Sequence, residues 1–74
     1  MRMKYDPQAD ALYIRLSEAD IEHSDEVETG IILDYDSADR LVAIEILDVR
    51  KRVAPPFTIK GELEIDMPAH ARDA

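Results

Sequence analysis

Three acidic side chains have the spacing of a calcium-binding loop. Asp34, Asp36 and Glu45 occupy the first, third and twelfth positions of such a loop, which supplies oxygen ligands from a sharply turned backbone. The fifth position is Ala38, which has no side-chain oxygen, and the sixth is Asp39, where the loop requires glycine. The flanking residues have strand-like rather than helical patterns. We therefore expect a polar hairpin turn here and no metal site.

Histidine could also contribute to a metal site. His23 lies close in sequence to Asp20, Glu22 and Asp25, while His70 is near the C-terminus. Imidazole and carboxylate groups both bind metal ions. Because their spacing matches no known site, the sequence favours a solvated histidine on the edge of a sheet.

The residue types needed for catalysis do not form a recognisable set. Ser24 follows His23, but adjacency in sequence is not the geometry of a nucleophile and its base. Carboxylates are so common that no pair stands out as general acid and base. With only Gly30 and Gly61, the chain also lacks a glycine-rich phosphate loop. The sequence therefore predicts no enzyme activity, no catalytic residues and no cofactor.

Size and composition narrow the class of protein. The chain has 74 residues, enough for one marginally stable domain, and no cysteine, so a cytoplasmic location is the default. No apolar stretch approaches the roughly 20 residues of a membrane span, and the N-terminus lacks the apolar centre of a signal peptide. The net charge of −8 disfavours binding to nucleic acid. It either attracts a cationic partner or only keeps the domain soluble.

The acidic charge is concentrated in residues 18–28. This segment contains six acidic residues and no lysine or arginine. It is either a loop or a weak edge strand, since charge on an edge strand discourages aggregation. We expect it to bind a basic protein partner through Glu18, Asp20, Glu22, Asp25, Glu26 and Glu28. The alternative is a small-ligand or metal-binding domain that uses the same acids. The basic run at 50–52 is either a solvated strand end, a contact for RNA or for an acidic partner, or a contact with residues 18–28 of a neighbouring subunit.

Alternation of apolar and polar residues predicts strands at residues 1–5, 12–16, 31–36 and 41–49. Asp6-Pro7 has turn chemistry and separates the first two, although this dipeptide could also begin a helix. Residues 30–47 form an antiparallel hairpin. The expected fold class is therefore mainly β, a small antiparallel β-meander over residues 1–54. Pro55-Pro56 marks the start of a C-terminal extension, residues 55–74, in which residues 59–65 could add a strand.

The predicted strand 41–49 is apolar on both faces. Val42, Ile44 and Ile46 line one face, and Glu45 interrupts the other. Strands of this kind are usually covered on both sides, here by a second subunit or by the C-terminal segment. We expect a homo-oligomer, at least a dimer, whose interface contains Leu41, Ala43, Leu47 and Val49.

Two segments resemble one known family. Residues 5–16, which read Tyr-Asp-Pro-Gln-Ala-Asp-Ala-Leu-Tyr-Ile-Arg-Leu, look like the opening of the domain-of-unknown-function family 2283. Residues 30–47, followed by Lys51-Arg52, are similar to its second signature, with Ala38-Asp39 where the family often has Asp-Gly. The resemblance covers residues 1–53. It implies a small bacterial protein without an assigned enzyme activity, and some members look like antitoxin components encoded beside small toxin-like proteins. The expected function is thus a small, acidic, antitoxin-like protein-binding module.

Overall fold

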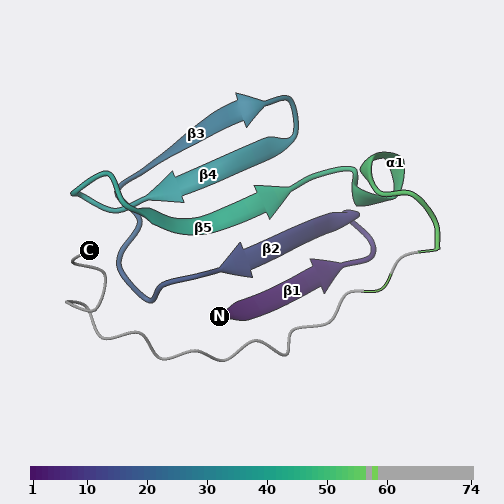
Figure 1. Cartoon of the computed structure of the whole chain (residues 1–74), viewed down its shortest axis with the longest axis horizontal. Helices are drawn as coiled ribbons and strands as arrows, with labels where there is room; N and C mark the ends of the chain where they lie inside the picture. The colour runs from purple at the N-terminus through teal and green to yellow at the C-terminus, as the bar shows by residue number, and fades with distance from the viewer. Residues whose placement is uncertain (57, 59–74) are drawn as a thin grey trace, which may run out of the picture.

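The fold is a single twisted layer of five antiparallel strands, seen in a computed structural model that describes residues 1–56 and 58. The strands are β1 (Arg2–Asp6), β2 (Ala11–Arg15), β3 (His23–Glu28), β4 (Ile31–Tyr35) and β5 (Leu41–Ile46), followed by the short helix α1 (Val49–Arg52) (Figure 1). The mainly β prediction is confirmed. The possible strand at residues 59–65, and His70, lie outside the described residues.

The order of strands across the sheet is β1-β2-β5-β4-β3, so the expected simple meander is wrong. β2 pairs with β5 rather than with β3, and the connection at residues 16–22 passes the ends of β5 and β4 to reach the far edge (Figure 1). β5 pairs along one edge with β2 and along the other with β4. It therefore lies between the two hairpins, although it comes last in the sequence.

Two turns depend on individual residues. Asp6 Oδ1 accepts hydrogen bonds from the backbone N–H groups of Gln8 and Ala9 at 3.0 and 3.3 Å, so the predicted turn after β1 is confirmed. Gly30 joins β3 to β4 with φ of 82°, a left-handed conformation that favours glycine. A Cβ atom at Gly30 would also collide with the Arg52 guanidinium group.

The two faces of the sheet differ sharply in chemistry. Residues directly opposite each other on neighbouring strands share a face, and Ile44 lies opposite both Ile14 and Leu33. We call this side the apolar face; it carries the eight apolar residues Met3, Tyr5, Leu12, Ile14, Ile31, Leu33, Ile44 and Ile46, and toward β3 also Tyr35, Leu41, His23 and the charged Asp25. The opposite side, the polar face, carries Arg2, Lys4, Tyr13, Arg15, Ser24, Glu26, Ile32, Asp34, Ala43 and Glu45.

The predicted strand at residues 41–49 is too long. β5 ends at Ile46, Asp48 has a left-handed backbone with φ of 55°, and Val49 begins α1. Val49 is 1% exposed, and its N–H donates to the Asp10 carbonyl at 3.1 Å. The helix therefore packs against the turn between β1 and β2, at one end of the sheet.

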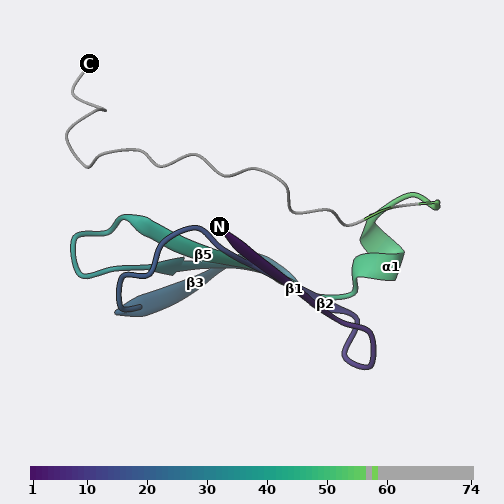
Figure 2. The same ribbon diagram turned by 90° about the horizontal axis from the view of Figure 1, so that it is seen from below.

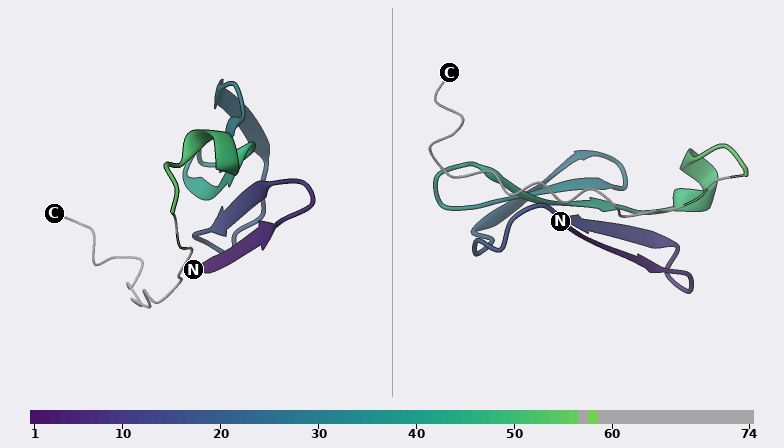
Figure 3. Two further views of the ribbon diagram at one scale, coloured as in Figure 1. Left: turned by 90° about the vertical axis from the view of Figure 1, so that its right-hand side faces the viewer. Right: turned by 60° about the horizontal axis from the view of Figure 1, so that its bottom comes forward.

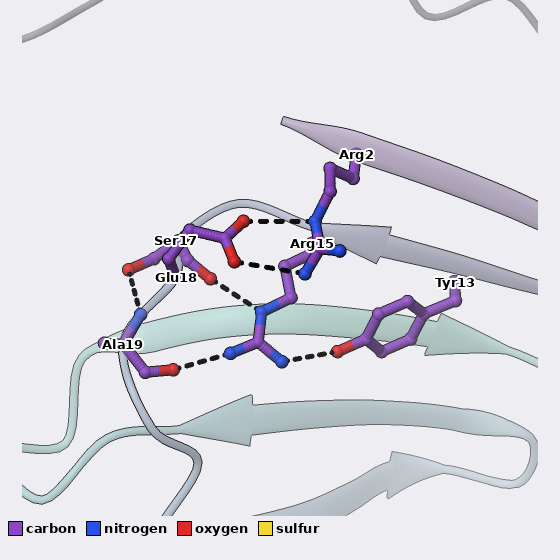
Figure 4. Close-up of polar contacts among 6 residues, drawn as sticks. All are labelled: Arg2, Tyr13, Arg15, Ser17, Glu18 and Ala19. Carbon is purple, nitrogen blue, oxygen red and sulfur yellow. Dashed lines mark hydrogen bonds and ion pairs between the residues drawn. The ribbon is translucent and has the colours of Figure 1, made fainter.

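The helix also stands on one side of the sheet. Figures 2 and 3 show α1 displaced from the sheet plane, toward the side that faces the viewer in Figure 1. Figure 4 shows the sheet from the other side, because β1 is uppermost there while the strand arrows point in the same directions as in Figure 1. In that view the side chains of Tyr13 and Arg15 project toward the viewer. Since those two residues belong to the polar face, α1 lies on the side of the apolar face.

Candidate functional site

The six predicted partner-binding acids follow the chain around one end of the sheet. Asp25, Glu26 and Glu28 lie on β3, whereas Glu18, Asp20 and Glu22 lie in the connection from β2, where Glu18 contacts Arg2 on the opposite edge strand β1. β3 is an edge strand, and all six of its residues are exposed. Residues 18–28 were expected to form either a loop or a weak edge strand, and each alternative is partly correct. Residues 16–22 form a connection, and β3 begins at His23. We call Glu18, Asp20, Glu22, Asp25, Glu26 and Glu28 the acidic edge.

Residues distant in sequence partly compensate this edge. Arg2 contacts Glu18 through two nitrogen–oxygen pairs at 3.1 Å. Arg52 Nη1 lies 3.9 Å from Glu28 Oε2. Both pairs are largely exposed, so each adds little to stability. Their effect is to lower the negative potential at the two ends of the acidic edge.

Three carboxylates of the acidic edge are free of direct contacts within the described residues. Asp20, Glu22 and Asp25 are exposed, and their side chains make no hydrogen bond or ion pair with any other described residue. Glu26 differs, because its carboxylate accepts a hydrogen bond from the Gly30 N–H at 2.9 Å. The negative potential of the edge is therefore expected to be strongest around Asp20, Glu22 and Asp25.

A network around Arg15 positions the first part of the acidic edge. The Arg15 guanidinium donates to the carbonyls of Ser17 and Ala19, at 2.8 and 2.7 Å, and to the Tyr13 hydroxyl at 3.1 Å (Figure 4). These bonds use the planar, multidentate geometry that is particular to arginine. Arg15 therefore orders the connection that carries Glu18 and Asp20.

His23 is not part of a cluster with its acidic sequence neighbours. Its ring stacks on Tyr35 with centroids 5.2 Å apart, and Nε2 lies 3.3 Å from Asp39 Oδ1. Within residues 1–56 and 58, no group of three or more His, Cys, Asp or Glu side chains is arranged to hold a metal ion. The alternative reading as a metal-binding domain gains no support from this geometry.

Sequence reasoning missed an interior carboxyl pair on the polar face. Asp34 is 1% exposed, its Oδ1 accepts a hydrogen bond from the Ser24 hydroxyl, and its Oδ2 has no partner among the described groups. The neighbouring Asp34 carboxyl raises the pKa of Glu45, and partial burial of the Glu45 carboxyl adds to the increase. The available signal was an acidic residue within each of two otherwise apolar strands.

The calcium-loop pattern does not bring its three acids to one centre. Asp36 Oδ1 accepts hydrogen bonds from the N–H groups of Ala38 and Arg40, both at 2.9 Å, and Oδ2 accepts one from Arg40 Nε. The backbone hydrogen bond from Arg40 is the largest cause of a lowered pKa at Asp36. Asp36 therefore organises its own hairpin turn, while Glu45 interacts with Asp34 on the sheet.

We predict that calcium does not bind specifically at residues 34–45. Calorimetric titration with calcium chloride is expected to show no saturable heat in the micromolar range, because Ala38 supplies no ligand and Asp36 is occupied by the turn. Saturable micromolar binding that is abolished by Asp36→Ala would contradict this prediction.

The four predicted interface residues do not form one exposed surface. Ala43 and Val49 are buried within a single chain, at 0% and 1% exposed, whereas Leu41 and Leu47 are 39% and 36% exposed. Ala43 lies opposite Arg15 on the polar face, and Val49 packs from α1 against the turn after β1. The chain itself thus covers two residues that we expected a second subunit to cover.

The fold and the acidic edge together define a small single-sheet β protein with a charged, open edge strand. Residues 2–50 match the family described as "Protein of unknown function (DUF2283)", and the chain belongs to this family. No curated protein and no solved structure matches the chain significantly. No helix in the described part of the chain is long and apolar enough to cross a membrane.

Proposed function

We propose that this protein is a small, non-enzymatic, cytoplasmic protein-binding module with an antitoxin-like role. Its partner is a basic protein that binds the acidic edge, and the protein also associates with itself. The observation that carries the proposal is the exposed group Asp20, Glu22 and Asp25. Their carboxylates make no hydrogen bond or ion pair with another described residue, and Arg15 interacts with Asp20 only at longer range.

The position of these acids at an open edge suits protein recognition. The outward side of β3 is not paired with another strand of the sheet, so its backbone groups are available to an added strand from a partner. Exposed acids raise the rate at which a basic protein associates, and salt screens this attraction over about 8 Å at physiological ionic strength. A partner that adds a basic strand would use both properties.

The test begins with co-purification of the tagged protein from its native host, followed by identification of any basic protein recovered. Affinity is then measured against salt concentration for the wild type and for a variant carrying Asp20→Asn, Glu22→Gln and Asp25→Asn. We expect the triple variant to bind about tenfold more weakly, because three exposed pairs each contribute about 0.5 kcal/mol. Its dependence on salt should also be shallower.

Asp48→Asn is the control for these measurements. Asp48 is exposed, lies at the opposite end of the sheet beside α1, and has a left-handed backbone that asparagine tolerates. This variant should bind the partner like the wild type. Recovery of no basic protein, or a triple variant with unchanged affinity and salt dependence, would overturn the proposal.

A further inference from the structure

The apolar face is not covered by a second layer within the described residues. Its eight side chains, from Met3 on β1 to Leu33 on β4, are all half-buried rather than buried. Domains normally pack two layers around one core, and here only α1 stands on this side, at one end of the sheet (Figure 2). A single sheet with one apolar face requires a partner surface of similar shape.

A second copy of this chain fits that face better than the C-terminal segment does. Five strands spaced about 4.8 Å apart make a face about 24 Å wide, whereas one extended segment adds a strip of about one strand spacing. Residues 59–65 would supply three large apolar side chains, Ile59, Leu63 and Ile65, against eight on the apolar face. A second apolar face supplies an equal number and an equal width.

We propose that the apolar face packs against the same face of a second copy, about a two-fold axis that runs across the strands. This proposal names the surface for the self-association in the proposed function. The basic partner still binds the acidic edge, whose strand β3 leaves its outer backbone groups at the rim of such a dimer.

The position of α1 selects this axis. A two-fold axis parallel to the strands would place the α1 helices of the two copies against each other, with their basic run Arg50, Lys51 and Arg52 face to face. An axis across the strands instead places each α1 beyond the opposite end of the partner sheet. That end carries the connection at 16–22 and the turn at 36–40, which together hold five acids and one arginine (Figure 3).

One charge contact favours the same arrangement, although this axis also stacks β3 of one copy on β3 of the other and so brings their acidic edges together. Lys51 is exposed, and among the described residues it makes no side-chain hydrogen bond or ion pair. In the proposed dimer it lies near the acidic loops of the second copy. The two contacts are equivalent by symmetry, as an isologous interface requires.

The size of the face sets the expected strength. The eight apolar side chains come from four strands of about five residues, so the flat footprint is about 19 Å by about 17 Å, or about 320 Å² per copy. Two copies bury less than the roughly 1,200 Å² of a standard specific interface, and contacts of α1 at both ends must supply the rest. We therefore expect a weak dimer with a dissociation constant in the micromolar range.

Sedimentation of the full-length chain from about 1 to 100 µM tests the dimer, since this range brackets a micromolar dissociation constant. The matched variants are Leu33→Lys on the apolar face and Ile32→Lys on the polar face, two half-buried neighbours on β4. We expect the wild type to form a dimer, Leu33→Lys to dissociate by a factor of at least ten with an unchanged circular dichroism spectrum, and Ile32→Lys to remain dimeric. If Leu33→Lys does not fold, Met3→Lys on the edge strand β1 replaces it.

Further variants distinguish the orientation and the occupant. Lys51→Glu is expected to weaken the dimer, and an unchanged dissociation constant would refute the axis across the strands. Combined Ile59→Lys, Leu63→Lys and Ile65→Lys substitutions should leave the dimer intact; dimerisation that appears only in this variant would identify the C-terminal segment as the occupant. A wild-type monomer at 100 µM, or equal effects of Ile32→Lys and Leu33→Lys on the dissociation constant of the dimer, would overturn the proposal. Neither result would affect the acidic-edge test, which measures partner binding separately.

Discussion

Replacing Val49 by alanine is expected to lower the free energy of unfolding by about 2 kcal/mol, the usual loss for removing buried methyl groups from a closely packed site. Val49 is 1% exposed and is the only buried residue of α1. A helix of four residues does not form by itself, so α1 depends on this packing. Because small domains are marginally stable, such a loss is a large fraction of the total.

Urea denaturation followed by circular dichroism measures this effect. The matched control is Val53→Ala, since Val53 follows the same helix and is 41% exposed. The control should change stability by less than about 0.5 kcal/mol, as surface substitutions usually do. A Val49→Ala protein as stable as the control would show that α1 does not anchor the end of the sheet.

The fold is expected to gain stability as the pH is lowered from neutrality toward the unfolded-state pKa of glutamate, and Glu45→Gln is expected to remove this gain. The neighbouring Asp34 carboxyl raises the pKa of Glu45 in the folded state, so the folded state binds a proton more tightly than the unfolded chain does. The resulting stability is fully present below the unfolded pKa and is lost as the pH rises through the folded pKa. Glutamine keeps a hydrogen-bond donor for Asp34 at every pH.

Other carboxyls act in the opposite direction at lower pH. A hydrogen bond from Tyr5 is the main cause of a lowered pKa at Asp10, and the backbone N–H of Arg40 is the main cause at Asp36. Their contributions are present above the unfolded pKa of aspartate and are lost as the pH falls through the folded pKa values. Stability should therefore pass through a maximum on the acidic side of neutrality.

Thermal unfolding at a series of pH values tests the role of Glu45. Glu22→Gln is the control, because Glu22 is an exposed acid of the acidic edge. We expect Glu45→Gln to be more stable than the wild type at pH 7 and to have a flatter profile, while Glu22→Gln keeps the wild-type profile. A wild-type stability that falls steadily from pH 7 downward would contradict the assignment of a raised pKa to Glu45.

The elements that sequence reasoning located correctly depend on neighbouring residues. Successive side chains of a strand point to opposite faces, so apolar and polar residues alternate with a period of two. This pattern located β1, β2 and β4 to within about two residues. The turn at Asp6-Pro7 is also local, because it depends on the backbone of the next few residues. The strand ending at Ile46 was misplaced because the left-handed residue Asp48, which turns the chain into α1, carries no glycine signal.

The candidate site was likewise predictable only where it depends on neighbouring residues in the sequence. The acidic edge was visible as a run of charges, and its exposure is consistent with the composition of β3, in which Val27 is the only apolar side chain. The contacts from Arg2 to Glu18 and from Arg52 to Glu28 were not visible, since each joins residues more than ten positions apart. The same holds for the pair formed by Asp34 and Glu45.

By itself, the sequence determined the β class, the alternation within each strand, the acidic edge and the family resemblance. Only the tertiary structure decided that β5 lies at the centre, that Ala43 faces Arg15, and that the apolar side chains of four strands share one face. The physical reason is that alternation assigns each side chain to one of two faces but does not specify which strands are neighbours. Strand order and register follow from burial of the whole apolar set, which is a property of the assembled sheet.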